Sequence, residues 1–133
     1  MSSPEATDAT PVATVFDEAG GMVFFAGLAH AFYQRVADDT TLRPLYPDDL
    51  GPGEDHLKLF LAQYWGGPTT YSDTRGHPRL RMRHVPFVIG PAEASHWLTN
   101  MVGAIDDMGT PDTLRQVMID YFTMATTHLV NQP

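Results

Sequence analysis

The chain has 133 residues, 43% of them hydrophobic and 18% charged, a composition that indicates one globular domain rather than a disordered segment. Its net charge of -8 argues against nucleic acid and an anionic membrane as main partners, and no apolar run approaches the roughly 18 residues of a membrane-spanning helix. It lacks cysteine, which excludes disulfides, thiolate ligands and a cysteine nucleophile and fits a cytoplasmic location.

The first part of the chain predicts a tail and two helices. Residues 1–14 are rich in serine, proline, threonine and alanine, and we expect them to form a disordered tail ahead of one domain over residues 15–133. A short helix and a longer one are expected between Val15 and Ala37, where apolar residues recur at helical spacing. Gly20-Gly21 separates them, because paired glycines interrupt a helix. The polar residues 38–41 are expected to end the longer helix and cap the next short one.

The middle of the chain predicts one substantial helix and one short helix. Pro52 suits the first turn of a helix that runs to about Trp65. Gly66-Gly67-Pro68 ends that helix, and we expect a loop from there to Gly76. A short helix is then expected over residues 78–85, between two prolines.

The last third of the chain predicts two further substantial helices. The first covers residues 91–108, with its apolar residues along one side. The second is expected to have Thr110 as its N-cap and Pro111 as its first residue, and to end near Leu129. The only β-like run, Phe87-Val88-Ile89, is too short to build a sheet. We therefore predict an all-α fold.

The segment with the most informative chemistry ends at His84. Four of the eight basic residues of the chain lie within the nine residues before this histidine: Arg75, Arg79, Arg81 and Arg83. A lone histidine near a helix end is most often a surface or hydrogen-bonded residue, and an arginine run is most often a solvated face. The alternative is a haem pocket, in which a neutral imidazole binds iron and guanidinium groups pair with the haem propionates.

Three residues on otherwise apolar segments, Tyr33, Tyr46 and Trp97, each present a polar tip on an apolar ring. Each is most simply a core aromatic residue whose polar atom finds a local partner. If all three converged on one cavity, they would form a hydrogen-bonding pocket for a small polar ligand. The sequence alone leaves both interpretations open.

Four stretches of the chain together resemble the group II truncated haemoglobins of actinobacteria and other bacteria. They are Phe32-Tyr33, residues 42–47 (LRPLYP), residues 60–68 (FLAQYWGGP) and residues 75–84 (RGHPRLRMRH). The last two are highly specific in combination, and the resemblance spans Val15 to Gln132. It implies an all-α, two-over-two helical sandwich that encloses haem b.

The resemblance also implies residue roles. His84 is the expected iron ligand, and Tyr33, Tyr46 and Trp97 are the expected hydrogen-bonding, and catalytic, residues on the distal side. The other expected haem contacts are Leu57, Phe60, Arg79, Met82, Arg83 and Phe87, together with Trp97 itself. Gly53 falls where other globins place a distal histidine, and its missing side chain is expected to leave a ligand path from solvent.

From the resemblance we expect a haem b protein that binds dioxygen and other diatomic ligands at a five-coordinate ferrous iron and releases oxygen slowly. Its distal donors would also suit peroxide reduction or nitric oxide oxidation, with a reductase as partner. A haem-based sensor without turnover shares the same residues, and a helical protein that has lost the cofactor is a third interpretation. We expect no nucleic-acid or membrane partner, and a homodimer is the candidate assembly.

Overall fold

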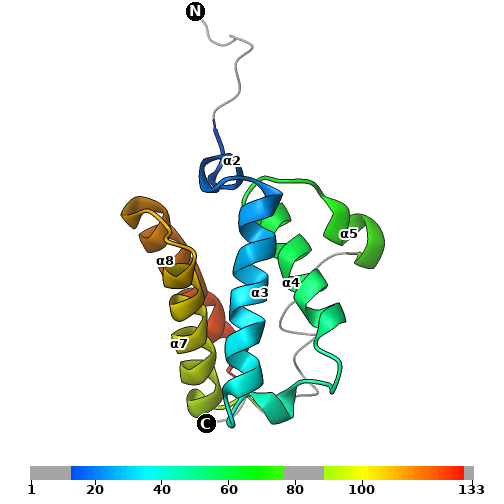
Figure 1. Cartoon of the computed structure of the whole chain (residues 1–133), viewed down its shortest axis with the longest axis vertical. Coiled ribbons are helices and arrows are strands. Elements are labelled where there is room, and N and C mark those ends of the chain that lie inside the picture. The colour runs from blue at the N-terminus through cyan, green and yellow to red at the C-terminus, as the bar shows by residue number, and fades with distance from the viewer. Residues whose placement is uncertain (1–12, 77–88, 131–133) are drawn as a thin grey trace, which may run out of the picture.

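The computed structural model of the chain describes residues 13–76 and 89–130, and these residues form helices and no strands (Figure 1). This confirms the predicted all-α fold. The helices are α2 (Val15–Ala19), α3 (Met22–Asp38), the 3-10 helix η1 (Arg43–Leu45), α4 (Gly51–Tyr64), α5 (Thr70–Arg75), α7 (Pro91–Asp107) and α8 (Asp112–Leu129).

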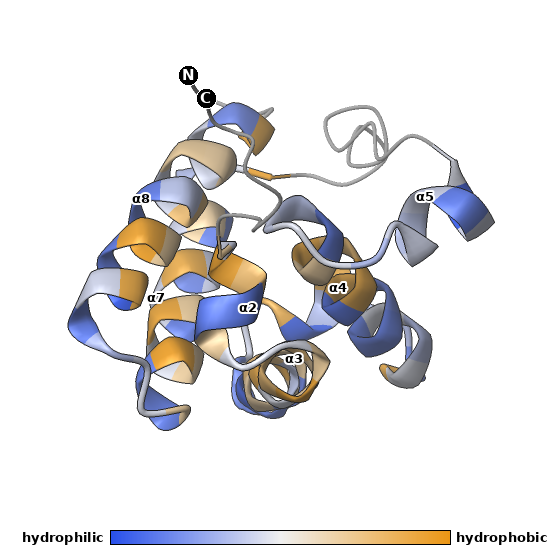
Figure 2. Cartoon of the chain, turned by 90° about the horizontal axis from the view of Figure 1, so that it is seen from above, coloured by the Kyte–Doolittle hydropathy of each residue, from blue (hydrophilic) through white to orange (hydrophobic). Residues whose placement is uncertain are grey.

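The four long helices form two packed pairs. Helix α3 packs against α4 on one side and α7 on the other, and α7 packs against α8. The short helix α5 lies against α4, at the outer edge of the molecule (Figure 1). The pairs α3–α4 and α7–α8 make up the two-over-two arrangement that the sequence predicts. Apolar residues gather along the sides on which these helices face one another (Figure 2).

Helix α3 supplies the centre of the core. Its apolar residues recur every three to four positions, so one side of the helix is buried along its whole length: Phe24, Phe25, Leu28, Ala29, Phe32, Tyr33 and Val36. Burying each large apolar side chain contributes roughly 1.5–3 kcal/mol relative to leaving it exposed. The predicted break before α3 is confirmed, because Gly20 and Gly21 have φ values of 114° and 74°, which glycine adopts without steric cost.

Helix α2 packs closely against the turn that follows α4. The Phe16 amide donates to the Trp65 carbonyl oxygen at 2.9 Å. A Cβ atom on Gly67 would lie 2.6 Å from the Phe16 ring and 2.8 Å from the Ala62 carbonyl oxygen. The ring of Phe25 stacks between Phe16 and Trp65, at centroid distances of 5.8 and 5.9 Å. The glycines that end α4 therefore also leave the space in which the first helix packs.

Two local predictions are wrong. The stretch expected to be a loop to Gly76 contains α5. The sequence of α5 has no regular spacing of apolar residues, and the helix is fixed by hydrogen bonds to the side chain of Gln63 in α4. The Gln63 side chain accepts from the Ser72 amide at 3.0 Å and donates to the Ser72 hydroxyl at 2.7 Å. Thr110 does not cap α8, because α8 begins at Asp112 with Pro111 in the N-cap position and no side-chain cap. The Thr110 hydroxyl instead donates to the Ile105 carbonyl oxygen at 2.8 Å.

Other predictions fall partly outside the described residues. Within the predicted tail, residues 1–12 are not described, whereas Thr14 is the N-cap of α2 and accepts from the Asp17 amide at 3.1 Å. The helix expected over residues 78–85 and most of the run Phe87-Val88-Ile89 also lie outside the described residues. In the described part of the chain, no helix is long and apolar enough to cross a membrane.

Candidate functional site

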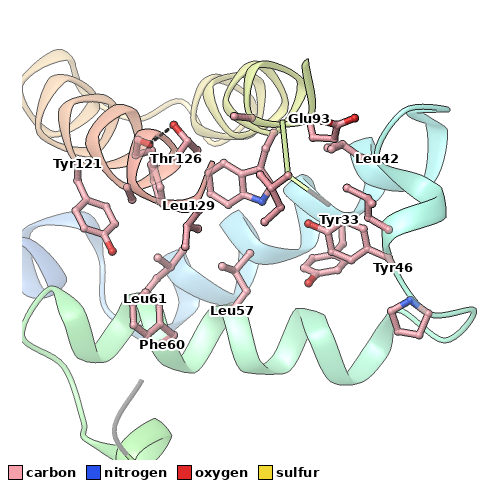
Figure 3. Close-up of a pocket in the computed structure, with 17 residues that line it drawn as sticks. Tyr33, Leu42, Tyr46, Leu57, Phe60, Leu61, Glu93, Tyr121, Thr126 and Leu129 are labelled. Atoms are coloured by element: carbon pink, nitrogen blue, oxygen red, sulfur yellow. Dashed lines mark hydrogen bonds between the residues drawn. The ribbon is translucent and has the colours of Figure 1, made fainter. Parts of the chain in front are cut away.

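A cavity of about 280 Å³ lies between α4 and the pair α7–α8. Its walls are mainly apolar: Leu42, Leu45, Pro47, Leu57, Phe60, Leu61, Ile89, Ala94, Phe122, Ala125 and Leu129 line it. Leu57 and Phe60 rise into it from α4, while Leu129 reaches it from α8 on the other side (Figure 3). Apolar side chains from these helices thus form the walls of one cavity.

The polar end of this cavity is formed by Tyr33, Tyr46 and Trp97. Tyr33 comes from α3, Tyr46 follows η1, and Trp97 comes from α7. The rings of Tyr33 and Tyr46 meet edge to face, with their centroids 5.6 Å apart. The structure therefore brings together three residues that are far apart in the sequence, which sequence patterns alone cannot show.

Burial raises the pKa of the Tyr46 hydroxyl to about 12, and the neighbouring Trp97 indole, a hydrogen-bond donor with no acceptor capacity, opposes part of that rise. The Tyr46 hydroxyl therefore keeps its proton at neutral pH and has it free to donate to a further acceptor.

Tyr33 is protonated at neutral pH as well. Burial is the largest cause that raises its pKa, followed by the neighbouring Tyr46 and Glu54. Gly53 determines how close α4 comes to this hydroxyl, because a Cβ atom on Gly53 would lie 2.7 Å from the Tyr33 oxygen. The Tyr33 hydroxyl thus occupies the space beside Gly53 that the sequence suggested was an open ligand path.

The opposite end of the cavity contains residues of α8 to which the sequence analysis assigned no role. Tyr121, Phe122 and Thr126 come from α8, and the buried Thr126 hydroxyl donates to the Phe122 carbonyl oxygen at 2.9 Å. Glu93, near the start of α7, lies beside Leu42 (Figure 3), and its carboxylate accepts from the Gly90 amide at 2.8 Å. A periodic apolar face indicates a buried helix face but not which cavity that face lines.

The proposed iron side of the pocket lies outside the described residues. His84, the expected iron ligand, belongs to the undescribed residues 77–88. The same is true of the other expected haem contacts from this segment: Arg79, Met82, Arg83 and Phe87. Among the residues that the structure describes, no group of three or more histidines and carboxylates could hold a metal ion. The described residues thus form an apolar slot with a hydrogen-bonding end, which suits a flat apolar cofactor with a small polar ligand.

Comparison with known proteins agrees with this geometry. A model of the bacterial-like globin family matches residues 14–131. The group 2 truncated hemoglobin YjbI of Bacillus subtilis is 39% identical over 115 residues, which cover 86% of this chain and 87% of that protein. A thermostable hemoglobin from the actinobacterium Thermobifida fusca has 51% identity and a TM-score of 0.89, over 91% of this chain and 99% of its own.

A third relative is a truncated haemoglobin of Bacillus subtilis described as oxygen-avid. Its structure has a TM-score of 0.85 and 37% identity, over 90% of this chain and 100% of its own. These relatives match nearly the full chain, so the likeness covers the whole helical sandwich and its cavity. The chain therefore belongs to the bacterial-like globin family, among the group II truncated haemoglobins, and this membership implies haem-based binding of diatomic ligands such as oxygen.

Proposed function

We propose that the chain binds haem b and uses it to bind dioxygen and other diatomic ligands, with slow release controlled by Tyr33, Tyr46 and Trp97. The observation that carries this proposal is the meeting of these three polar side chains at one end of a mainly apolar cavity. When bound, haem supplies an iron that coordinates the diatomic ligand. Leu57 and Phe60 would cover the apolar cofactor from α4.

The remaining haem-binding roles rest on the resemblance of the sequence. His84 is proposed as the iron ligand, Arg79 and Arg83 as partners of the propionates, and Met82 and Phe87 as apolar contacts. Trp97 lines the same end of the cavity as Tyr46, so it would complete the apolar wall and add a further donor beside Tyr46.

The slow release follows from the donors. Hydrogen bonds to a charged acceptor contribute about 1.5–3 kcal/mol, and each 1.4 kcal/mol changes an equilibrium about tenfold. Tyr33 and Tyr46 are both protonated at neutral pH, so both can donate to a ligand that carries partial negative charge. The Bacillus subtilis relative described as oxygen-avid supports this part of the proposal.

Slow release suits chemistry or sensing better than oxygen delivery. We therefore include peroxide reduction and nitric oxide oxidation in the proposal, and a haem-based sensor without turnover is the alternative. Turnover with a reductase as electron donor, followed by product analysis, separates the two. The reductase, a homodimeric assembly and a cytoplasmic location rest on the sequence considerations alone.

Absorption spectra of the purified protein in its ferric, ferrous and oxygenated forms test the central proposal. We expect a Soret band, a five-coordinate ferrous form and a stable oxygenated form. Stopped-flow dissociation of oxygen then measures the release rate. A protein that purifies without haem and does not take it up when haem is added would contradict the proposal.

A further inference from the structure

The carboxylate of Asp39 lies at the junction of α3, η1 and α7, and it is bonded on both sides. Its Oδ1 atom accepts from the backbone amides of Thr41 at 2.8 Å and Leu42 at 3.0 Å. Its Oδ2 atom accepts from the Asn100 side-chain amide at 2.7 Å and contacts the His96 Nδ1 atom at 3.0 Å. The Asp39 side chain is only 13% exposed.

Each oxygen of this carboxylate holds one of the two segments that bring Tyr46 and Trp97 into the lining of the same cavity. The Oδ1 side fixes the turn that enters η1, and Tyr46 is the residue that ends η1. The Oδ2 side holds α7 at His96 and Asn100, which precede Trp97 by one residue and follow it by three. Residues three apart lie on the same side of a helix, so these bonds hold α7 on the turn that carries Trp97.

We propose that Asp39 is a positioning residue for the distal pocket, which sets the placement of Tyr46 relative to Trp97 and thereby the release rate of the bound ligand. The effect on release rests on the function proposed above, whereas the effect on the placement of Trp97 relative to Tyr46 does not. A carboxylate suits the task because it only accepts hydrogen bonds and has room for four, whereas an amide in its place would turn a donor toward one side. The bond with His96 is the largest cause that holds the pKa of Asp39 well below its usual value, so the group stays ionised.

A second ion pair provides a matched control. Arg35 of α3 donates to both oxygens of Asp107, at 2.9 and 3.0 Å, and so joins α3 to α7 as Asp39 does. Asp107 lies ten residues beyond Trp97, about 15 Å along the helix axis. Asp107→Asn therefore weakens the contact between the same two helices without touching the turn that carries Tyr46.

The experiment compares wild type, Asp39→Asn, Asp107→Asn and the double variant Asp39→Asn/Trp97→Phe. Oxygen dissociation is measured by stopped flow, and the two indole N–H signals by ¹⁵N NMR of the carbon monoxide form, with Trp97→Phe identifying the Trp97 signal. We expect Asp39→Asn to raise the oxygen off-rate about threefold or more and to shift the Trp97 signal, and Asp107→Asn to do neither. In the Trp97→Phe background, Asp39→Asn should change the off-rate less, because the two residues act through one contact.

Three outcomes would overturn the proposal. An unchanged Trp97 signal and off-rate in Asp39→Asn would make Asp39 a helix cap only, and an equal effect of Asp107→Asn would indicate general loosening. If the effects of Asp39→Asn and Trp97→Phe on the oxygen off-rate are fully additive, Asp39 does not act through Trp97. If Asp39→Asn does not fold, Asn100→Ala removes one of the two bonds between Asp39 and α7, leaves the bonds to the turn before η1 intact, and must still shift the Trp97 signal. If the protein binds no haem, the function proposed above fails, while the indole signals still test the role of Asp39.

Discussion

Tyr46 shows how neighbouring side chains decide what a single hydroxyl can do. Burial raises the pKa of this hydroxyl and the neighbouring Trp97 indole lowers it in part, so the hydroxyl keeps its proton at neutral pH and can donate it to a ligand in the cavity. Tyr33 meets the ring of Tyr46 edge to face and adds a second hydroxyl at the same end.

Removing the Tyr33 hydroxyl tests this arrangement at the scale of one atom. Tyr33→Phe keeps the ring in the core and deletes a donor, and we expect it to raise the oxygen off-rate about tenfold or more. Stopped-flow dissociation measures the rate. Trp97→Phe should also raise it, and the double change should be non-additive because the donors share one ligand. Carbon monoxide, which is less polarised when bound, should respond less. Off-rates that neither substitution alters would make these residues ordinary core aromatics.

Gly53→Ala tests the close approach of α4 to the same hydroxyl. The added Cβ atom would lie 2.7 Å from the Tyr33 oxygen, so the hydroxyl must move and the oxygen off-rate should rise, as in Tyr33→Phe. In a Tyr33→Phe background the nearest ring carbon would be 3.2 Å away, so the same change should have a smaller effect. Stopped-flow measurements of the four proteins give the coupling. Equal effects of Gly53→Ala in both backgrounds would show that this contact does not act through the hydroxyl.

At the scale of helices, the sequence was sufficient to predict a helix wherever one face of that helix is buried. The stripes of α3, α4 and α7 were recognisable because burial imposes a period on the sequence. Helix α5 has no such stripe, because it is held by Gln63, a partner outside the helix. The cap expected at Thr110 was also wrong, because α8 starts one residue later, with Pro111 in the N-cap position, and the Thr110 hydroxyl bonds to Ile105 of the preceding helix. Contacts between distant segments leave no periodic trace.

The same limit applies to the pocket. Tyr33, Tyr46 and Trp97 could be named from their family resemblance, but each is indistinguishable by pattern from an ordinary core aromatic. Their convergence depends on the packing of α3, η1 and α7. From the sequence, Asp39 could be predicted only to lie at the end of a helix. Its contacts with α7 could not be predicted, because they join residues 57 and 61 positions apart in the sequence.

Gly67→Ala tests the packing of α2 on the turn after α4. Its Cβ atom would overlap the Phe16 ring and a backbone oxygen, neither of which can move freely, so we expect a loss of about 1–3 kcal/mol in unfolding free energy. Gly103→Ala is the matched control, because its Cβ atom would meet the flexible end of Arg35. The gain in helix propensity there should offset a weakened surface ion pair to within about 1 kcal/mol. Urea unfolding measures both, and equal losses would contradict the importance of the α2 contact.

At the scale of the whole molecule, the proposed iron ligand His84 provides a test of haem retention. His84→Ala should abolish stable haem incorporation, because the proposed bond between protein and iron is lost while the apolar slot remains. The haem content after purification, measured from the Soret band, checks this. His128→Ala, which removes an exposed histidine of α8, is the control and should retain haem. A His84→Ala protein with full haem and an unchanged ferrous spectrum would show that another residue binds the iron.

The acid stability of the whole molecule should depend on Asp39. Its bonds with His96, Asn100 and two backbone amides lower its pKa in the folded state, so the unfolded chain binds more protons at acid pH. The stabilisation is therefore complete above the unfolded pKa of about 3.9, and it is lost as the pH falls from there through the folded value.

Asp39→Asn cannot ionise, so the difference in unfolding free energy between wild type and this variant should be constant near neutral pH and shrink below about pH 4. Urea unfolding of both proteins, from neutral pH down to about pH 3, measures the difference. The carboxylate of Asp107 is nearly half exposed and screened by solvent, so Asp107→Asn should show a much smaller difference at every pH. A difference between wild type and Asp39→Asn that stays the same at all pH values would mean that Asp39 stabilises the junction by its shape, not its charge.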